Sequence, residues 1–178
     1  VGWFHDQMIS AIQEIAGRSK TNIVKNVEEG GGVKQFKSYI SGCLESFRDS
    51  ADVNLLILNP SDFEVWRQDS KPFGVEASMA SLTPTEITQI VSEAALEVLQ
   101  AMGKPENGKA RLCMVYEEAH SLVPEFNSVV APGDKSATNG TARAILQGRK
   151  YGMGCLLITQ RTANVTKTIL NQCNTIFA

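Results

Sequence analysis

The sequence predicts an α/β protein in which a parallel sheet is flanked by helices. Two continuous apolar runs, LCMVY (112–116) and CLLIT (155–159), have the length and composition of strands that are buried on both faces. A helical pattern precedes each run, and strands that alternate with helices favour parallel pairing. We expect residues 1–72 to form a mainly helical segment and residues 73–178 to form the α/β unit.

Composition limits the classes of function. At 178 residues with 43% hydrophobic residues, the chain can bury one sizeable core. The formal net charge of -2 argues against a uniformly basic nucleic-acid binder, so any DNA contact would be local or shared among subunits. The four cysteines show no CxxC spacing, which indicates a reducing compartment and no metal site formed by cysteines.

The chain has no targeting or membrane signal that we can identify. No apolar run reaches the ~18 residues of a membrane span, and no signal peptide is present. A cytoplasmic protein without a membrane partner is therefore expected. Because the sequence begins at Val1 and ends at Ala178 within an apolar run, we also expect it to be an excerpt of a longer protein.

The first elements follow from apolar spacing. Helical periods predict helices over residues 3–16 and, after the glycines at 30–32, over residues 33–47. The run VNLLIL (53–58) predicts either a short strand or a buried turn. FGVEASM (73–79) alternates as a strand does.

A capped helix leads to the first buried strand. Thr83 is placed as the N-cap, Pro84 stands at the first helical position, and Glu86 completes a capping box. The apolar stripe that follows predicts a helix over residues 86–102. The polar segment 103–111 is expected to be the turn into LCMVY.

The remaining elements are a loop, two helices and two strands. Small polar residues without any period extend from Pro124 to Gly140, which predicts a mobile loop. We then expect a helix over 141–151, the strand CLLIT, a helix over 164–173 and a third strand beginning at NTIFA (174–178).

Charged and polar side chains follow both predicted buried strands. Glu117 and Glu118 come directly after LCMVY, and Gln160 follows CLLIT. Ligands collect at the carboxyl ends of parallel strands, where one carboxylate can help to hold Mg²⁺ and another can polarise an attacking water, as in a Walker B element. The alternative is that the glutamates only mark the point where the strand leaves the core. His120 either orients a phosphate or a neighbouring group, or merely begins the next turn.

A basic pair stands at the end of the helix before CLLIT. Arg149 and Lys150 occupy a position where cations interact favourably with the helix dipole. We expect them to join the carboxylates and Gln160 around one edge of the sheet, where they would supply positive charge for a phosphate.

No phosphate-binding loop is found in the sequence. GKPENGKA (103–110) ends in alanine, which lacks the hydroxyl that ligates Mg²⁺, and it stands between a predicted helix and a predicted strand, the reverse of the usual order. EIAGRSKT (14–21) lacks the required glycines. Both are rejected.

Three ordered motifs, VYEEAH, GRKYGMGCLLITQR and TKTILNQCNTIF, resemble the HerA/FtsK-type hexameric P-loop ATPases, most closely the HerA branch of DNA translocases. The resemblance covers roughly residues 73–178. It implies a RecA-like core, ATP and Mg²⁺ at the subunit interfaces of a homo-hexamer, duplex DNA in the ring pore, and a nuclease partner in DNA-end processing or anti-phage defence. Residues 1–72 would then be a helical insertion.

The resemblance also implies roles for individual residues. Glu118 would activate the water, Glu117 would stand where the family commonly has a Mg²⁺-associated aspartate, and Gln160 would be the sensor of the γ-phosphate. Arg149, and less strongly Arg143, would be the arginine finger for a neighbouring subunit. Further contacts to the nucleotide are assigned to Lys150, Arg161 and His120.

Two other classes of function stay open at this point. One is a conjugation or secretion ATPase of the same superfamily, and the other is an oligomerisation module that does not hydrolyse nucleotide. Lys135 and Lys167 are candidates for DNA contacts, although either can equally be a solvated surface lysine.

Overall fold

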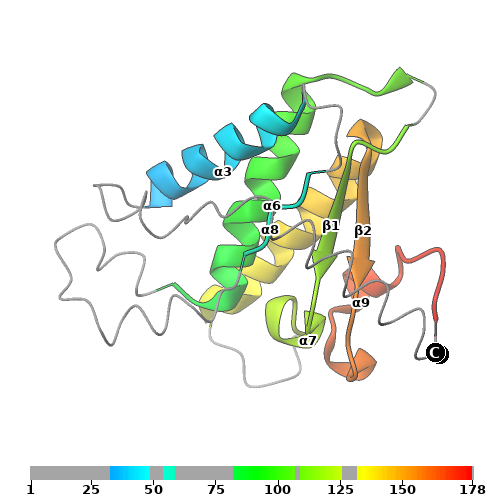
Figure 1. Ribbon diagram of the computed structural model, residues 1–178. Coiled ribbons are helices and arrows are strands. Elements are labelled where there is room, and N and C mark those ends of the chain that lie inside the picture. The colour runs from blue at the N-terminus through cyan, green and yellow to red at the C-terminus, as the bar shows by residue number, and fades with distance from the viewer. Residues whose placement is uncertain (1–32, 49–53, 59–81, 107–108, 126–131, 178) are drawn as a thin grey trace, which may run out of the picture.

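The computed structural model of the chain describes residues 33–48, 54–58, 82–106, 109–125 and 132–177 (Figure 1). In these ranges helices cover one face of a small parallel sheet, which confirms the α/β class and the helical character of the N-terminal part. The predicted helix over 3–16 and the predicted strand over 73–79 lie outside the described residues. None of the helices in the described ranges combines the length and the apolar composition that a membrane crossing requires.

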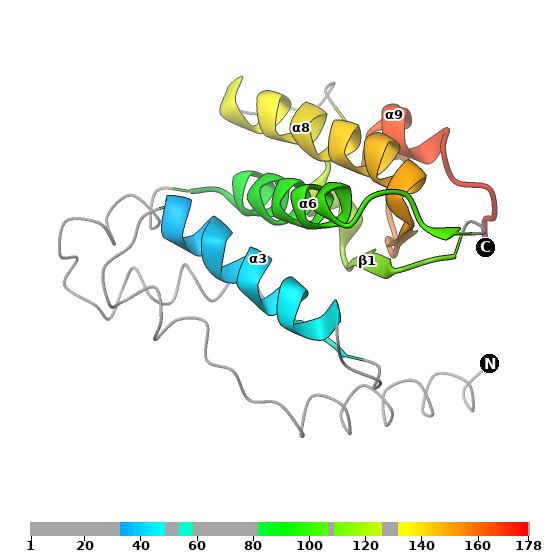
Figure 2. The same ribbon diagram turned by 90° about the horizontal axis from the view of Figure 1, so that it is seen from above.

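Three helices form one layer, with α6 (Pro84–Ala101) between α3 (Val33–Arg48) and α8 (Pro132–Gly148) (Figure 2). Phe36 and Ile40 of α3 are fully buried in one cluster with Ile87 and Ile90 of α6. Helix α3 therefore shares its core with the α/β unit.

The start of α6 has the predicted cap. The Thr83 side chain accepts a hydrogen bond from the Glu86 amide at 3.2 Å, and the Glu86 carboxylate accepts one from the Thr83 amide at 2.8 Å. The Thr83 hydroxyl also donates to Asp134 at 2.7 Å, which joins the first turn of α8 to the cap of α6. Pro84 and the capping box are thus confirmed.

Helix α8 begins much earlier than predicted. The expected loop up to Gly140 is wrong, because residues 132–148 form one helix. Its small residues pack closely on α6: Thr138 and Thr141 are fully buried, and a Cβ atom on Gly140 would lie within 3 Å of the Gln89 side chain. A count of large apolar residues cannot detect a helix whose buried face consists of alanine, threonine and glycine. The 3-10 helix η2 (Arg149–Tyr151) follows directly.

In the described ranges the sheet has two parallel strands, β1 (Leu112–Tyr116) and β2 (Met153–Leu157). Leu112 stands opposite Met153, and Tyr116 stands opposite Leu157. Helix α8 lies between the two strands in sequence, so β1, α8 and β2 form the βαβ arrangement that parallel pairing needs. The predicted strand 155–159 begins two residues earlier than expected, at Met153.

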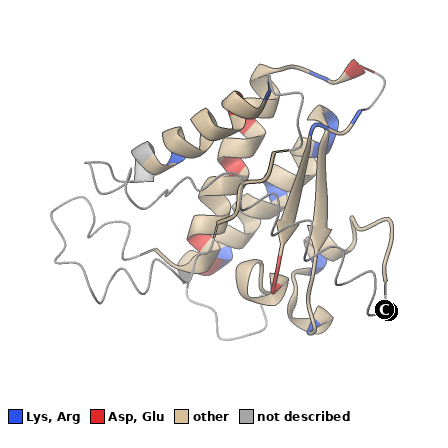
Figure 3. Cartoon of the chain, viewed as in Figure 1, with Lys and Arg blue, Asp and Glu red and all other residues tan. Residues whose placement is uncertain are grey.

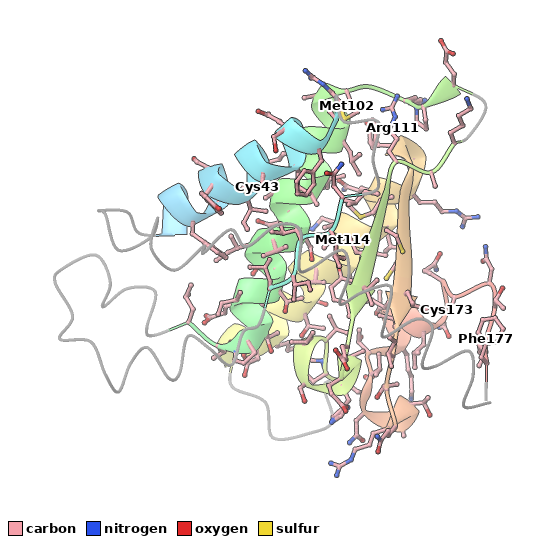
Figure 4. The ribbon with its side chains drawn as sticks, viewed as in Figure 1. Cys43, Met102, Arg111, Met114, Cys173 and Phe177 are labelled. Carbon is pink, nitrogen blue, oxygen red and sulfur yellow. The ribbon has the colours of Figure 1, made fainter. Side chains whose placement is uncertain are left out.

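Among the described residues, helices cover only one face of this sheet. Met114 lies between β1 and the helices and packs in a cluster with Met153 and Leu99 (Figure 4). Side chains alternate along a strand, so the other face carries Val115, which is 54% exposed, and Leu156, which is 42% exposed. The expectation that both strands are buried on both faces is therefore wrong. Cys113 and Cys155 are exposed free thiols.

The C-terminal region differs from the predicted helix and strand. The helix expected over 164–173 is replaced by a 3-10 helix, η3 (Thr162–Asn164), and a single helical turn, α9 (Lys167–Leu170). Between them Val165 forms an antiparallel bridge with Pro124, which imposes an extended backbone. Residues 174–177 form no strand, and Phe177 is 91% exposed at the periphery (Figure 4).

Two connections complete the described chain. Residues 54–58 form no strand, although Leu56 and Leu58 pack against the α3–α6 cluster. The segment between α6 and β1 is irregular where it is described, as predicted. Arg111 donates to the Gly103 carbonyl at 2.7 Å across this turn. The rejected GKPENGKA motif thus lies between a helix and a strand, where it was expected.

Candidate functional site

The carboxyl ends of β1 and β2 border an open pocket of about 290 Å³. Five residues line it: Glu118, His120, Ser121, Gln160 and Arg161. Four of them are candidates predicted from the sequence, and they come from two segments about 40 residues apart. The pocket lies at the edge where parallel sheets bind their ligands.

Glu118 has an unusual backbone. Its φ of 52° and ψ of 46° are left-handed, and it is the one non-glycine residue in the described ranges with a positive φ. For an L-residue this conformation costs roughly 1–2 kcal/mol. Hydrogen bonds hold it on both sides: the Ala119 amide donates to the Ile158 carbonyl at 3.0 Å, and the Ser121 amide donates to the Glu118 carbonyl at 2.8 Å. The turn therefore fixes a glutamate whose side chain is 56% exposed at the pocket.

His120 connects the two strand ends. It lies in the single helical turn α7 (Ala119–Leu122), and its Nδ1 is 3.3 Å from Glu118 Oε2 and 3.2 Å from Thr159 Oγ1. Thr159 Oγ1 also accepts a hydrogen bond from the Arg161 amide at 3.0 Å. The acidic residue after β1 and the turn that carries Gln160 are thus joined through side chains.

Tyr116 fixes the end of β1 directly before the two glutamates. Its hydroxyl is 3.0 Å from Ser92 Oγ, and Ser92 uses its own hydrogen to bond the Thr88 carbonyl at 2.7 Å, so Tyr116 is the donor. Burial raises the pKa of the Tyr116 hydroxyl above its usual range, and the hydrogen bond with Ser92 offsets part of that shift. The phenol stays neutral and ties the strand to α6 directly before the two glutamates.

Glu117 is exposed in the turn after β1 and does not line the pocket. Within the described ranges, no three His, Cys, Asp or Glu side chains are placed to hold a metal ion together. A nucleotide-bound Mg²⁺ needs only one or two carboxylates, because phosphates and water complete its coordination. The exposed carboxylate of Glu118, with Glu117 beside it in sequence, has the hard oxygen donors that suit such an ion.

Three of the basic candidates, Arg143, Arg149 and Lys150, do not line the pocket at this edge. Arg149 and Lys150 lie in η2, before the amino end of β2, and Arg143 is exposed on α8. Figure 3 shows the basic residues of η2 at the end of the strands opposite the acidic residues that follow β1, while other basic residues lie beyond the carboxyl end of β2. Five residues at about 3.3 Å each separate the two edges by roughly 16 Å. The expected grouping of Arg149 and Lys150 with the carboxylates and Gln160 within one chain is wrong.

Two residues of the site were not among the predicted candidates. Ser121 lines the pocket three residues after Glu118, and Thr159 supplies the oxygen that His120 contacts. The only sequence signal for Thr159 is a hydroxyl next to Gln160. Its contact with His120 spans 39 positions and depends on the strand register.

No family model, curated protein or solved structure matches the chain. The interpretation of the site therefore depends on the sequence motifs and on the geometry of this edge.

Proposed function

We propose that the chain is the carboxyl-side part of the RecA-like ATPase core of a HerA-type DNA translocase, which hydrolyses ATP as a homo-hexamer around duplex DNA. The observation that carries this proposal is the convergence of Glu118, Gln160 and Arg161 in one pocket at the carboxyl edge of a parallel strand pair. A general base, a polar sensor and a cation are the groups that hydrolysis of a phosphoanhydride requires.

In this proposal each pocket residue has a separate task. Glu118 accepts the proton of the attacking water, and Gln160 orients the water or the γ-phosphate. Arg161 offsets the negative charge that spreads over the phosphate oxygens. Glu117 or Glu118 would help to hold a Mg²⁺ ion that arrives with the nucleotide, and the ion would supply positive charge for the phosphates.

The positions of Arg149, Lys150 and Arg143 are compatible with a ring of subunits. An arginine finger acts on the nucleotide of a neighbouring subunit, so it must lie away from the site of its own chain. Arg149 and Lys150 lie at the opposite end of the strands from Glu118, and Arg143 is exposed on α8. This arrangement supports Arg149 as the first candidate for the finger.

A second candidate function has one observation in its favour. The 178 residues contain no acceptable phosphate-binding loop, which is what an oligomerisation module without hydrolysis would show. Under the main proposal, the full-length protein supplies that loop from outside this sequence, and these residues supply the base and the sensor.

The test is ATP hydrolysis by the full-length protein. We expect Mg²⁺-dependent turnover that duplex DNA stimulates, with stimulation that weakens steeply between about 50 and 200 mM salt because the grip on DNA is electrostatic. EDTA is the control that removes the metal. Absence of turnover at saturating ATP and DNA would favour the oligomerisation module.

A further inference from the structure

We infer that His120 is a positioning residue that bridges the Glu118 carboxylate and the Thr159 hydroxyl, and so links the catalytic base to the sensor turn. The effect that we expect on ATP turnover rests on the proposed function. The geometric part of the inference, the bridge between the two strand ends, stands on the described contacts alone.

The contacts decide which imidazole nitrogen carries a proton. Nδ1 of His120 faces two oxygens, at 3.3 Å from Glu118 and at 3.2 Å from Thr159. A carboxylate can only accept a hydrogen bond, so a bare Nδ1 would set its lone pair against that of Glu118. Nδ1 is therefore the protonated nitrogen; it donates to Thr159 Oγ1 and places its proton beside the Glu118 carboxylate.

The Thr159 hydroxyl oxygen can accept hydrogen bonds from two neighbours. It already accepts a hydrogen bond from the Arg161 amide at 3.0 Å, and a hydroxyl can accept a second one. The same hydrogen bond closes the turn around Gln160. A shift of Gln160 would therefore move Thr159, and through His120 it would move Glu118.

Burial makes the histidine the rigid member of the bridge. The His120 side chain is 19% exposed, whereas that of Glu118 is 56% exposed. Without its partner, Glu118 would keep its fixed backbone but would gain rotamer freedom at the mouth of the pocket. A catalytic base that samples several rotamers spends less time in the reactive geometry, so the effect should fall on kcat.

Kinetics of single and double variants of the full-length protein test the linkage. His120→Ala and Thr159→Val are each expected to lower kcat about 10- to 100-fold. KM for ATP should change by less than about twofold, because the lost interaction positions the base and does not bind substrate. The double variant should be no slower than the slower single variant, since both changes break one bridge.

Conservative variants are the matched controls. Asn has an amide nitrogen near the position of Nδ1, so His120→Asn should restore most of kcat, and Thr159→Ser should do the same because it keeps the hydroxyl. Wild-type kcat in His120→Ala would overturn the inference, and so would additive losses in the double variant.

A measurement that needs no activity separates this inference from the proposed function. The His120 signal in ¹⁵N-histidine spectra is assigned as the one that disappears in His120→Asn. At a pH where imidazole is neutral, we expect the Nδ1–H tautomer for His120 and its loss in Glu118→Ala, because the Glu118 carboxylate is the neighbour that can only accept a hydrogen bond. An Nε2–H tautomer in the wild-type protein would overturn the bridge. If the tautomer is as expected but no ATP is hydrolysed, the proposed function fails and the bridge stands.

Discussion

Glu118→Gln is expected to lower ATP turnover by the full-length protein about 10²- to 10⁴-fold, the usual contribution of a general base. Glutamine has nearly the same shape and keeps an oxygen that His120 can contact, but its amide cannot take the proton of the attacking water. ATP binding should therefore stay intact while hydrolysis stops. Steady-state turnover and equilibrium binding of ATP measure the two effects separately.

The matched control is Glu106→Gln. Glu106 is an exposed glutamate in the connection before the amino end of β1, so the same chemical change is made at the other end of the strand. It should leave turnover unchanged. Equal turnover in Glu118→Gln and in the wild-type protein would show that Glu118 is not the base.

Glu118→Gly separates chemistry from folding at the same position. Glycine relieves the left-handed strain of roughly 1–2 kcal/mol but adds unfolded-state freedom of about 0.5–1 kcal/mol. We expect this variant to be inactive and yet as stable as the wild-type protein or more so, by up to about 1.5 kcal/mol. A clear loss of stability in urea denaturation would show that the glutamate is needed for folding.

Gly152→Ala is expected to reduce the free energy of unfolding by about 2–4 kcal/mol. This loss combines the cost of a left-handed backbone for alanine with the cost of a steric clash. Gly152 has a φ of 88°, and a Cβ atom there would lie 2.8 Å from the Lys109 carbonyl oxygen. This oxygen belongs to the backbone, so it cannot move aside as the end of a side chain would. Urea denaturation, with the slope compared between variants, measures the loss.

Gly42→Ala is the control for this substitution. Gly42 lies within α3, and a Cβ atom there would meet nothing within 4 Å. Alanine favours a helix over glycine, so this variant should gain about 0.5–1 kcal/mol. Equal effects of the two substitutions would contradict the described turn before β2.

The turn at Gly152 also bears on the site. Its carbonyl accepts a hydrogen bond from the Arg111 amide at 2.8 Å, next to the first paired residues of the sheet. This contact helps to fix the register of β2 on β1. The register in turn determines that Thr159 and Gln160 emerge beside Glu118 and His120.

The sequence predicted those elements that have local signals. The capping box at Thr83 and the apolar runs of β1 and β2 were sufficient to locate α6 and the sheet. Helix α8 was missed because its contact face is made of small residues, which apolar periodicity ignores. Burial of the sheet was overestimated, because an apolar run does not tell how many layers pack on it.

The site residues that the sequence predicted are likewise those with local signals. Glu118 and Gln160 were found because both follow strands, and parallel strands end at one edge. Arg149 was assigned to the wrong edge within its own chain, since a segment that leads into a parallel strand must finish at the amino end of that strand. The contact between His120 and Thr159 has no local signal, because it depends on tertiary pairing.

Hydrogen exchange of the full-length Glu118→Gln variant, with and without Mg²⁺ and ATP, tests the central claim most directly. The claim is that the two strand ends together form the nucleotide site. We expect nucleotide to slow amide exchange in peptides that cover both 117–121 and 158–162, the segments that border the pocket. Protection confined to other segments at saturating ATP, with both of these unchanged, would contradict it.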